Sequence, residues 1–257
     1  MYTYNDARMR DLQARFQEIC AMVDVDLEPV RRFAPNHRSE VYKAILKSLA
    51  IGDATLVNLG IELAREKFPG GVAQVYPMLH LPNDTNERGS WHRDDKIDTR
   101  RVFWIPLTLY KYPGLSVVTW SAGVLSSAFA FAGSRLVNLD VLSSKVNVAD
   151  KTFYAWSPRM IHRGNLNTSN EISSALVIFI DSDSTATQAP LPTLTPELVH
   201  ECIAGVTSAV RFAGDGQINH LDRSRLDVLP EPFRSHFYSF FKLRTKLDLQ
   251  QWQPAAA

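Results

Sequence analysis

The stretch ADKTFYAWSPRMIH, residues 149–162, contains two short β-rich runs separated by a turn. Aromatic and β-branched side chains fill the first run, 152–156, and Ser157-Pro158 separates it from the second, 160–162. Runs of this kind recur between residues 72 and 181, at 72–81, 103–110, 116–120, 128–132, 145–148, 152–156, 160–162 and 174–180. Short strands at this spacing predict a sandwich or barrel, and eight of them fit a jelly roll. The predicted fold class is therefore mainly β with flanking helices.

Amphipathic helices are predicted before the first of these strands. Asn5 can cap a helix whose apolar positions follow three- and four-residue spacing, namely Met9, Leu12, Phe16, Ile19 and Val23. Further helices are expected from Ser39 and from Asp53, and Pro69-Gly70-Gly71 ends the last of them. Residues 1–71 are thus predicted to be a helical flank.

Helices are predicted again after the last strand. Thr195 is a capping residue, Pro196 occupies the first turn, and the helix is expected to reach about Phe212, just before Gly214. A second helix is expected over 233–247. Because no linker rich in Gly, Ser or Pro divides the chain, its 257 residues predict one domain: a helical flank 1–71, a β core 72–181 and a helical flank 182–257.

Charge and cysteine content narrow the classes of function. Lys and Arg number 28 against 27 Asp and Glu, so the net charge of +1 gives no overall field favouring nucleic acid or an anionic membrane. Cys20 and Cys202 are too few and too far apart for a disulfide framework, and reduced thiols are expected. Without a targeting segment or a long apolar run, the sequence predicts a soluble, cytoplasmic protein. The expected partner is a small molecule.

Trp91-His92-Arg93-Asp94 lies just before the strand predicted at 103–110. The period-two alternation of an extended chain points His92 and Asp94 to the same side. His162 follows His92 by 70 positions, at the end of the run 160–162. Two imidazoles and one carboxylate on one face of an octahedral metal leave other positions open, as a non-heme iron(II) centre requires. His-x-Asp alone is a weak motif, so its setting in the chain decides its meaning.

The setting of His162 resembles the distal-histidine segment of the iron(II)/2-oxoglutarate-dependent oxygenases, most of all their phytanoyl-CoA dioxygenase-like branch. In that branch a Gly-Asp turn opens a strand, the histidine follows, and an Asn-x-Ser pair lies in the next turn. Here Ala149 replaces the glycine, whereas His162, Asn167 and Ser169 match. Residues 91–94 resemble the Trp-His-x-Asp of the same branch. The resemblance covers about residues 72–181 and implies a double-stranded β-helix core of the cupin-like, jelly-roll type.

The resemblance implies that His92, Asp94 and His162 are both the metal ligands and the catalytic residues. It also implies that iron(II) is the metal and that 2-oxoglutarate is the co-substrate. In this family 2-oxoglutarate occupies two of the open positions and dioxygen the last, and the product is a small molecule hydroxylated at an unactivated C–H bond. The protein's own tasks are then to position the reactants and exclude water.

One position departs from the family pattern. The family places an arginine eleven residues after the distal histidine, where it pairs with the far carboxylate of 2-oxoglutarate, and this chain has Ser173 there. A single hydroxyl cannot replace a fork of two parallel N–H donors. Candidate co-substrate residues elsewhere are Arg100, Arg101, Lys111 and Thr108, with Ser173 itself, and Arg135 and Arg159 are further basic candidates. Strand alternation disfavours Arg159, because it should face away from His162.

The missing arginine leaves three hypotheses open. The leading one is a 2-oxoglutarate-dependent oxygenase with a relocated anchor. The second is a non-catalytic jelly-roll binding protein that has lost the anchor, and the third is an iron oxygenase that does not use 2-oxoglutarate.

The run 72–81 alternates polar and apolar side chains. Gln74, Tyr76, Met78 and His80 share one face, which belongs either to a strand exposed to solvent or to the wall of a ligand pocket. Pattern alone does not choose between these two interpretations.

Overall fold

The computed structural model describes residues 1–82, 90–108, 114–118, 139–146, 149–212 and 218–242. The chain divides into two compact units, one comprising Met1–Gln17 and Ala54–Pro190 and the other Glu18–Asp53 and Leu191–Ala257. The division falls within helix α1, Met9–Val25. The single domain therefore stays a prediction from the sequence.

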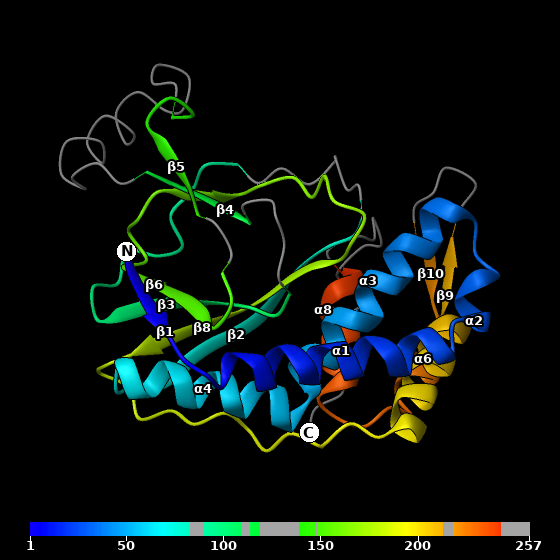
Figure 1. Ribbon diagram of the computed structural model, residues 1–257. Helices are drawn as coiled ribbons and strands as arrows, with labels where there is room; N and C mark the ends of the chain where they lie inside the picture. The colour runs from blue at the N-terminus through cyan, green and yellow to red at the C-terminus, as the bar shows by residue number, and fades with distance from the viewer. Residues whose placement is uncertain (83–89, 109–113, 119–138, 147–148, 213–217, 243–257) are drawn as a thin grey trace. The chain divides into compact units, whose positions relative to one another are not determined.

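Two antiparallel sheets form the β part of the first unit (Figure 1). The larger sheet has the strand order β1-β6-β3-β8-β2, with β1 Tyr2–Asn5, β6 Thr152–Trp156, β3 Arg100–Pro106, β8 Ser173–Asp181 and β2 Gly71–His80. The smaller sheet has the order β5-β4-β7, with β5 Ser143–Val146, β4 Leu115–Val118 and β7 His162–Gly164. Antiparallel sheets with helices are thus established, and the eight-stranded jelly roll stays a prediction.

The core lies where the two sheets face each other. Residues of alternating positions on the larger sheet pack with residues of the smaller one in a single cluster: Val102, Trp104, Leu115, Val117, Val146, Tyr154, Trp156, Ala175, Val177 and Phe179. Tyr76 and Met78 of β2 pack against the same cluster. The polar face of β2 is therefore turned to the inside of the β unit, which favours the pocket-wall interpretation.

Helix α4, Ala54–Lys67, covers the opposite face of the larger sheet (Figure 1). A β-carbon at Gly60 would lie 2.7 Å from Leu176 Cδ2 and 3.7 Å from Ile105 Cδ1, so glycine permits this close approach. Phe103, Ile105 and Leu107 alternate with Val102 and Trp104 and are also buried. Both faces of β3 are therefore covered.

The second unit is mainly helical. It contains α2 Glu28–Arg31, α3 Pro35–Gly52, α6 Pro196–Ala209, α7 Arg223–Leu226, α8 Phe233–Lys242 and a hairpin of β9 Val210–Phe212 with β10 Ile218–Leu221. Phe233, Phe237 and Phe241 of α8 are fully buried. Burial raises the pKa of the Cys20 and Cys202 thiols to about 12, and the nearby carboxylates of Asp24 and Glu201 add to it, so both stay protonated.

Most helix predictions are confirmed. The stripe of α1 is fully buried from Met9 to Val23, and Thr195 caps α6 by accepting a hydrogen bond from the Leu198 backbone N–H at 3.3 Å. No single helix among the described residues is long and apolar enough to cross a membrane, although His37–Gly52 and Ala54–Lys67 pass that test of length and composition as a bent pair.

Several boundaries were wrong. Residues 2–5 are not helical but form β1, which pairs with β6, so Asn5 does not cap the helix. The helix begins at Met9, and in the turn before it the Asp6 carboxylate accepts from the Arg8 backbone N–H at 2.9 Å. The helix predicted up to Phe212 ends at Ala209, because Val210–Phe212 pairs with β10. The strand predicted at 160–162 begins at His162, because Met160 closes a turn with Ser157. The run 128–132 lies outside the described residues.

Candidate metal centre

Backbone hydrogen bonds hold the segment around His92 against β7. The His92 N–H donates to the His162 carbonyl and the His162 N–H donates to the His92 carbonyl, both at 3.0 Å. This reciprocal pair is an antiparallel bridge between the two residues. Residues 70 positions apart are thereby aligned with their imidazole centroids 4.4 Å apart.

Asp94 is positioned through both its backbone and its side chain. Its N–H donates to the Pro158 carbonyl at 3.0 Å, and its Oδ2 accepts from the Trp156 indole at 3.2 Å. Trp156 is fully buried in the core between the sheets, so its indole is a fixed donor. Since Oδ2 is engaged, Oδ1 is the oxygen that remains for a further ligand.

The imidazoles are oriented in the same manner. His92 Nδ1 lies 2.8 Å from the Ser90 carbonyl oxygen, and His162 Nδ1 lies 3.0 Å from the Met160 carbonyl oxygen. A carbonyl can only accept, so each Nδ1 carries a proton, and in a neutral imidazole of this tautomer Nε2 is the nitrogen that can bind a metal. Metal-binding histidines in proteins are usually oriented by such a second hydrogen bond.

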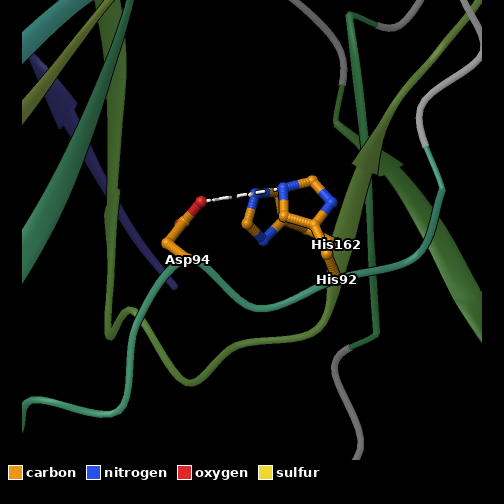
Figure 2. Close-up of side chains that lie close together, drawn as sticks. All are labelled: His92, Asp94 and His162. Carbon is orange, nitrogen blue, oxygen red and sulfur yellow. Dashed lines mark ion pairs between the residues drawn. The ribbon is translucent and has the colours of Figure 1, made fainter. Parts of the chain in front are cut away.

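The three free ligand atoms converge, as Figure 2 shows. Asp94 Oδ1 lies 3.4 Å from His162 Nε2 and 3.7 Å from His92 Nε2, and the three ligand atoms lie within 4.8 Å of one another. Neighbouring ligands about 2.1 Å from an octahedral ion are about 3 Å apart. Both spacings from Asp94 Oδ1 are within several tenths of an ångström of that value, whereas the two Nε2 atoms, up to 4.8 Å apart, would have to move closer by more than 1 Å to share an ion. The donor set of two imidazoles and a carboxylate fits iron(II).

Exposure differs sharply among the three ligands. The side chains of Asp94 and His162 are 5% and 6% exposed, whereas that of His92 is 46% exposed. A metal held here is therefore enclosed on the Asp94 side and approachable past His92. Burial raises the pKa of the Tyr76 phenol, and the negative charge of Asp94 adds to it, so Tyr76 remains a neutral hydroxyl facing the site.

Trp91 and Arg163 add a second link between the same two segments. The Arg163 guanidinium lies 4.4 Å from the Trp91 ring centroid and forms an ion pair with Asp140. Arg163 is only 8% exposed, so the cation–π contact is shielded from water. Each partner of this stack is the chain neighbour of a metal-ligand candidate, so the stack joins the two segments that carry His92 and His162.

Replacing Arg163 with Ala should weaken metal binding about tenfold without removing it. The backbone bridge remains, but the stack that fixes the ligand spacing is lost, and the loss of groups that support metal ligands costs 10–100-fold in affinity. Competition with a chromophoric chelator measures the effect. Arg159→Ala is the matched control, because Arg159 is exposed and binds Asp98. Equal affinities for both variants would show that the stack has no positioning role.

The basic candidates for co-substrate binding have other partners. Arg100 donates to Asp181 Oδ2 at 3.1 Å and to Asp95 Oδ2 at 2.5 Å, so two carboxylates balance its charge. Arg101 is on the face of Phe103, away from the core between the sheets, with its guanidinium 5.1 Å from the Phe68 ring centroid. The structure does not bring either residue to the three ligand candidates.

The remaining candidates differ in placement. Thr108 Oγ1 donates to the Ser174 carbonyl at 3.3 Å and accepts from the Ser174 N–H at 2.8 Å. Ser173 is buried at the start of β8. Arg159 is exposed and binds Asp98, while Lys111 and Arg135 lie outside the described residues.

Two functional side chains were not predicted from the sequence. Trp156 lies in the core, and its indole also donates a hydrogen bond to Asp94. Tyr76 was seen only as part of a polar strand face whose direction was open. The alternation of β2 is the signal that could have found Tyr76, once the neighbouring strands fix which face is interior.

No protein-family model matches the chain, and no curated protein matches it. Structural neighbours at low identity are oxygenases of the non-heme iron and 2-oxoglutarate type. AviO1 from Streptomyces viridochromogenes Tue57 is 17% identical with a TM-score of 0.37, and the match covers 55% of this chain and 62%, less than two thirds, of AviO1. SnoK, a non-heme alpha-ketoglutarate-dependent carbocyclase from nogalamycin biosynthesis, is 17% identical with a TM-score of 0.41, covering 55% and 69%.

The non-heme monooxygenase ThoJ, in its apo form, is 10% identical with a TM-score of 0.47, and the match covers 95% of this chain and 96% of ThoJ. Similarity at this level selects neither a branch of the oxygenases nor a substrate. The function of the chain therefore has to be inferred from its own side chains.

Proposed function

We propose that this protein is a non-heme iron(II)-dependent oxygenase that uses 2-oxoglutarate and dioxygen to hydroxylate a small molecule. The observation that carries the proposal is the convergence of His92 Nε2, Asp94 Oδ1 and His162 Nε2, each with its second heteroatom already hydrogen-bonded. A chance cluster of polar side chains would have no reason to share this orientation. The proposal includes a double-stranded β-helix core and membership of the phytanoyl-CoA dioxygenase-like branch, which the resemblance of residues 149–169 and 91–94 supports.

Iron(II) with 2-oxoglutarate, when bound, supplies the power to activate dioxygen and oxidise an unreactive C–H bond. His92, Asp94 and His162 would hold the metal from one side, which would leave positions for the co-substrate and dioxygen. Trp156 keeps Asp94 aimed at the metal, and aromatic side chains of the core, such as Tyr76 and Trp104, line the interior face of the sheet. Such a lining limits access of water to the reacting groups.

The small-molecule substrate is part of the same proposal, together with a cytoplasmic location. The net charge of +1 supports the small-molecule substrate, because it gives no strong positive field that would attract nucleic acid or an anionic membrane. The exposure of His92 supports access of a freely diffusing ligand from one side.

The proposal is tested by loading the protein with iron(II) under argon, adding 2-oxoglutarate, and admitting oxygen. We expect succinate to form in amounts that depend on iron, oxygen and 2-oxoglutarate, and His162→Ala protein to form none above the metal-free background. Oxygen consumption that needs a substrate but no 2-oxoglutarate would support an iron oxygenase of a different type. Iron binding without oxygen consumption, across a library of candidate substrates, would support a non-catalytic binding protein.

A further inference from the structure

The interior face of the larger sheet changes character along its strands. On this face Val177 of β8 lies between Trp104 of β3 and Tyr76 of β2, and Ala175 of β8 lies opposite Met78 of β2. All of these side chains are apolar or aromatic. The next pair in the register is His80 of β2 with Ser173 of β8. An imidazole and a hydroxyl thus lie side by side at the end of an otherwise apolar face.

Ser173 is the residue that stands where the resembling oxygenases have their arginine. It is 7% exposed, and strand alternation turns it to the same side as Ala175 and Val177. His80 and Ser173 form directly opposed positions of an antiparallel pair, so their Cβ atoms are about 5 Å apart. His80 therefore brings a nitrogen donor to the level of the missing guanidinium.

The turn between β7 and β8 fixes this pairing. Asn167 is fully buried, and its Nδ2 donates to the Leu81 carbonyl at 2.9 Å and to the Glu171 carbonyl at 2.7 Å. Its Oδ1 accepts from the Ser169 hydroxyl at 2.7 Å. One amide therefore holds the end of β2 beside the start of β8, next to His80 and Ser173.

Gly164, on the same strand as His162, indicates how far His80 lies from the candidate metal ligands. A β-carbon placed on Gly164 would lie 3.9 Å from His80 Nε2 and 3.6 Å from Met78 Cε, so β7 presents this position toward β2. Gly164 and His162 are two residues apart on β7 and share a face, which separates them by about 7 Å. The five-carbon backbone of 2-oxoglutarate, with four zigzag bonds of about 1.5 Å, spans about 5 Å. With its carboxylate oxygens the molecule is comparable in length to the spacing between His162 and Gly164.

We propose that His80 and Ser173 together bind the far carboxylate of the 2-oxo acid co-substrate. A ring N–H of His80 donates one hydrogen bond and the Ser173 hydroxyl donates a second. These two donors take the place of the two parallel N–H groups of an arginine. The ligand class is a short 2-oxo dicarboxylate with its 2-oxo acid end at the metal. This inference rests on the proposed function.

The test compares two ligands with the same chelating end, 2-oxoglutarate and 2-oxobutanoate, the second of which lacks the far carboxylate. Their dissociation constants for the iron(II)-loaded protein are measured under argon by calorimetry and by the visible absorption of the chelate. Wild type should prefer 2-oxoglutarate. His80→Leu should weaken 2-oxoglutarate about ten- to one-hundredfold and leave 2-oxobutanoate unchanged, because a hydrogen bond to a charged group is lost.

Ser173→Ala should weaken 2-oxoglutarate only severalfold, and His80→Arg should restore the preference by supplying a guanidinium. His200→Leu is the matched control, because His200 is exposed and binds Asp26. Iron(II) affinity is also measured without either 2-oxo acid. An equal value for His80→Leu and wild type shows that the variant is folded.

Three outcomes would count against this inference, and they differ in what they imply for the proposed function. Preference for 2-oxoglutarate that persists in His80→Leu would place the anchor elsewhere and overturn the inference, while the proposed function would stand. Failure of wild type to bind either ligand in a metal-dependent manner would overturn both. Equal affinity of wild type for the two ligands would show that no anchor exists.

Discussion

Replacement of Asp94 with Asn should reduce the affinity for iron(II) more than about 100-fold. The substitution keeps the size of the side chain but removes the one negative charge among the three ligands. Even the loss of a group that only supports a metal ligand costs 10–100-fold in affinity, so the loss of a ligand itself should exceed that range. His162→Ala should have an effect of the same order, because the remaining two ligands no longer define one face of the ion.

Anaerobic titration with iron(II), or with nickel(II) as a stable substitute, measures this effect directly. A second measurement is the midpoint of thermal unfolding, which metal should raise in wild type and leave unchanged in Asp94→Asn. Asp95→Asn is the matched control, because Asp95 is the adjacent carboxylate and pairs with Arg100 instead of joining the cluster. Equal iron(II) affinity of wild type and Asp94→Asn would rule out the proposed metal centre.

The sequence predicts the β core well because its strands combine aromatic and β-branched residues with clear breaks. The run predicted at 72–81 is β2, Gly71–His80, and the run at 152–156 is β6. The metal-ligand candidates were also found from sequence, since His92 and Asp94 lie in one tetrapeptide and His162 in a recognisable segment. Their convergence follows from a backbone bridge between residues 70 positions apart, which no local pattern encodes.

Long-range pairing explains what the sequence did not predict. Tyr2–Asn5 is a strand only because β6 offers it an edge, and Val210–Phe212 leaves the helix only because β10 pairs with it. His80 showed the same dependence: its polar character was visible, but the direction of its strand face was set by the core that β2 joins. Local propensity is a weak guide wherever tertiary pairing decides the outcome.

Replacement of Asn167 with Asp should lower the free energy of unfolding by about 3–5 kcal/mol at neutral pH, since it buries a charge and places one of its oxygens against two carbonyl acceptors. Asn167 is fully buried, and its amide donates to the carbonyl oxygens of Leu81 and Glu171. An aspartate keeps the contact with Ser169 but turns its second oxygen toward those carbonyls. Two carbonyl acceptors then face a carboxylate oxygen in place of an N–H donor.

The pH dependence of this variant distinguishes the mechanism from a simple loss of packing. Burial and the two carbonyl oxygens that face one carboxylate oxygen raise the folded-state pKa of this aspartate above the usual value of about 3.9. Because the folded pKa is raised, the protonated form is favoured on folding, so the deficit is smallest below the unfolded pKa and grows as the pH rises through the folded pKa. Urea unfolding at several pH values measures this trend.

Thr168→Asp is the matched control, because Thr168 is exposed in the same turn and water solvates the added charge. Its stability should change by less than about 0.5 kcal/mol. If Asn167→Asp were as stable as this control, the amide would not be what joins β2 to β8. The pairing of His80 with Ser173 depends on that junction, so a destabilised Asn167→Asp protein should also bind 2-oxoglutarate more weakly where it is still folded, with 2-oxobutanoate less affected.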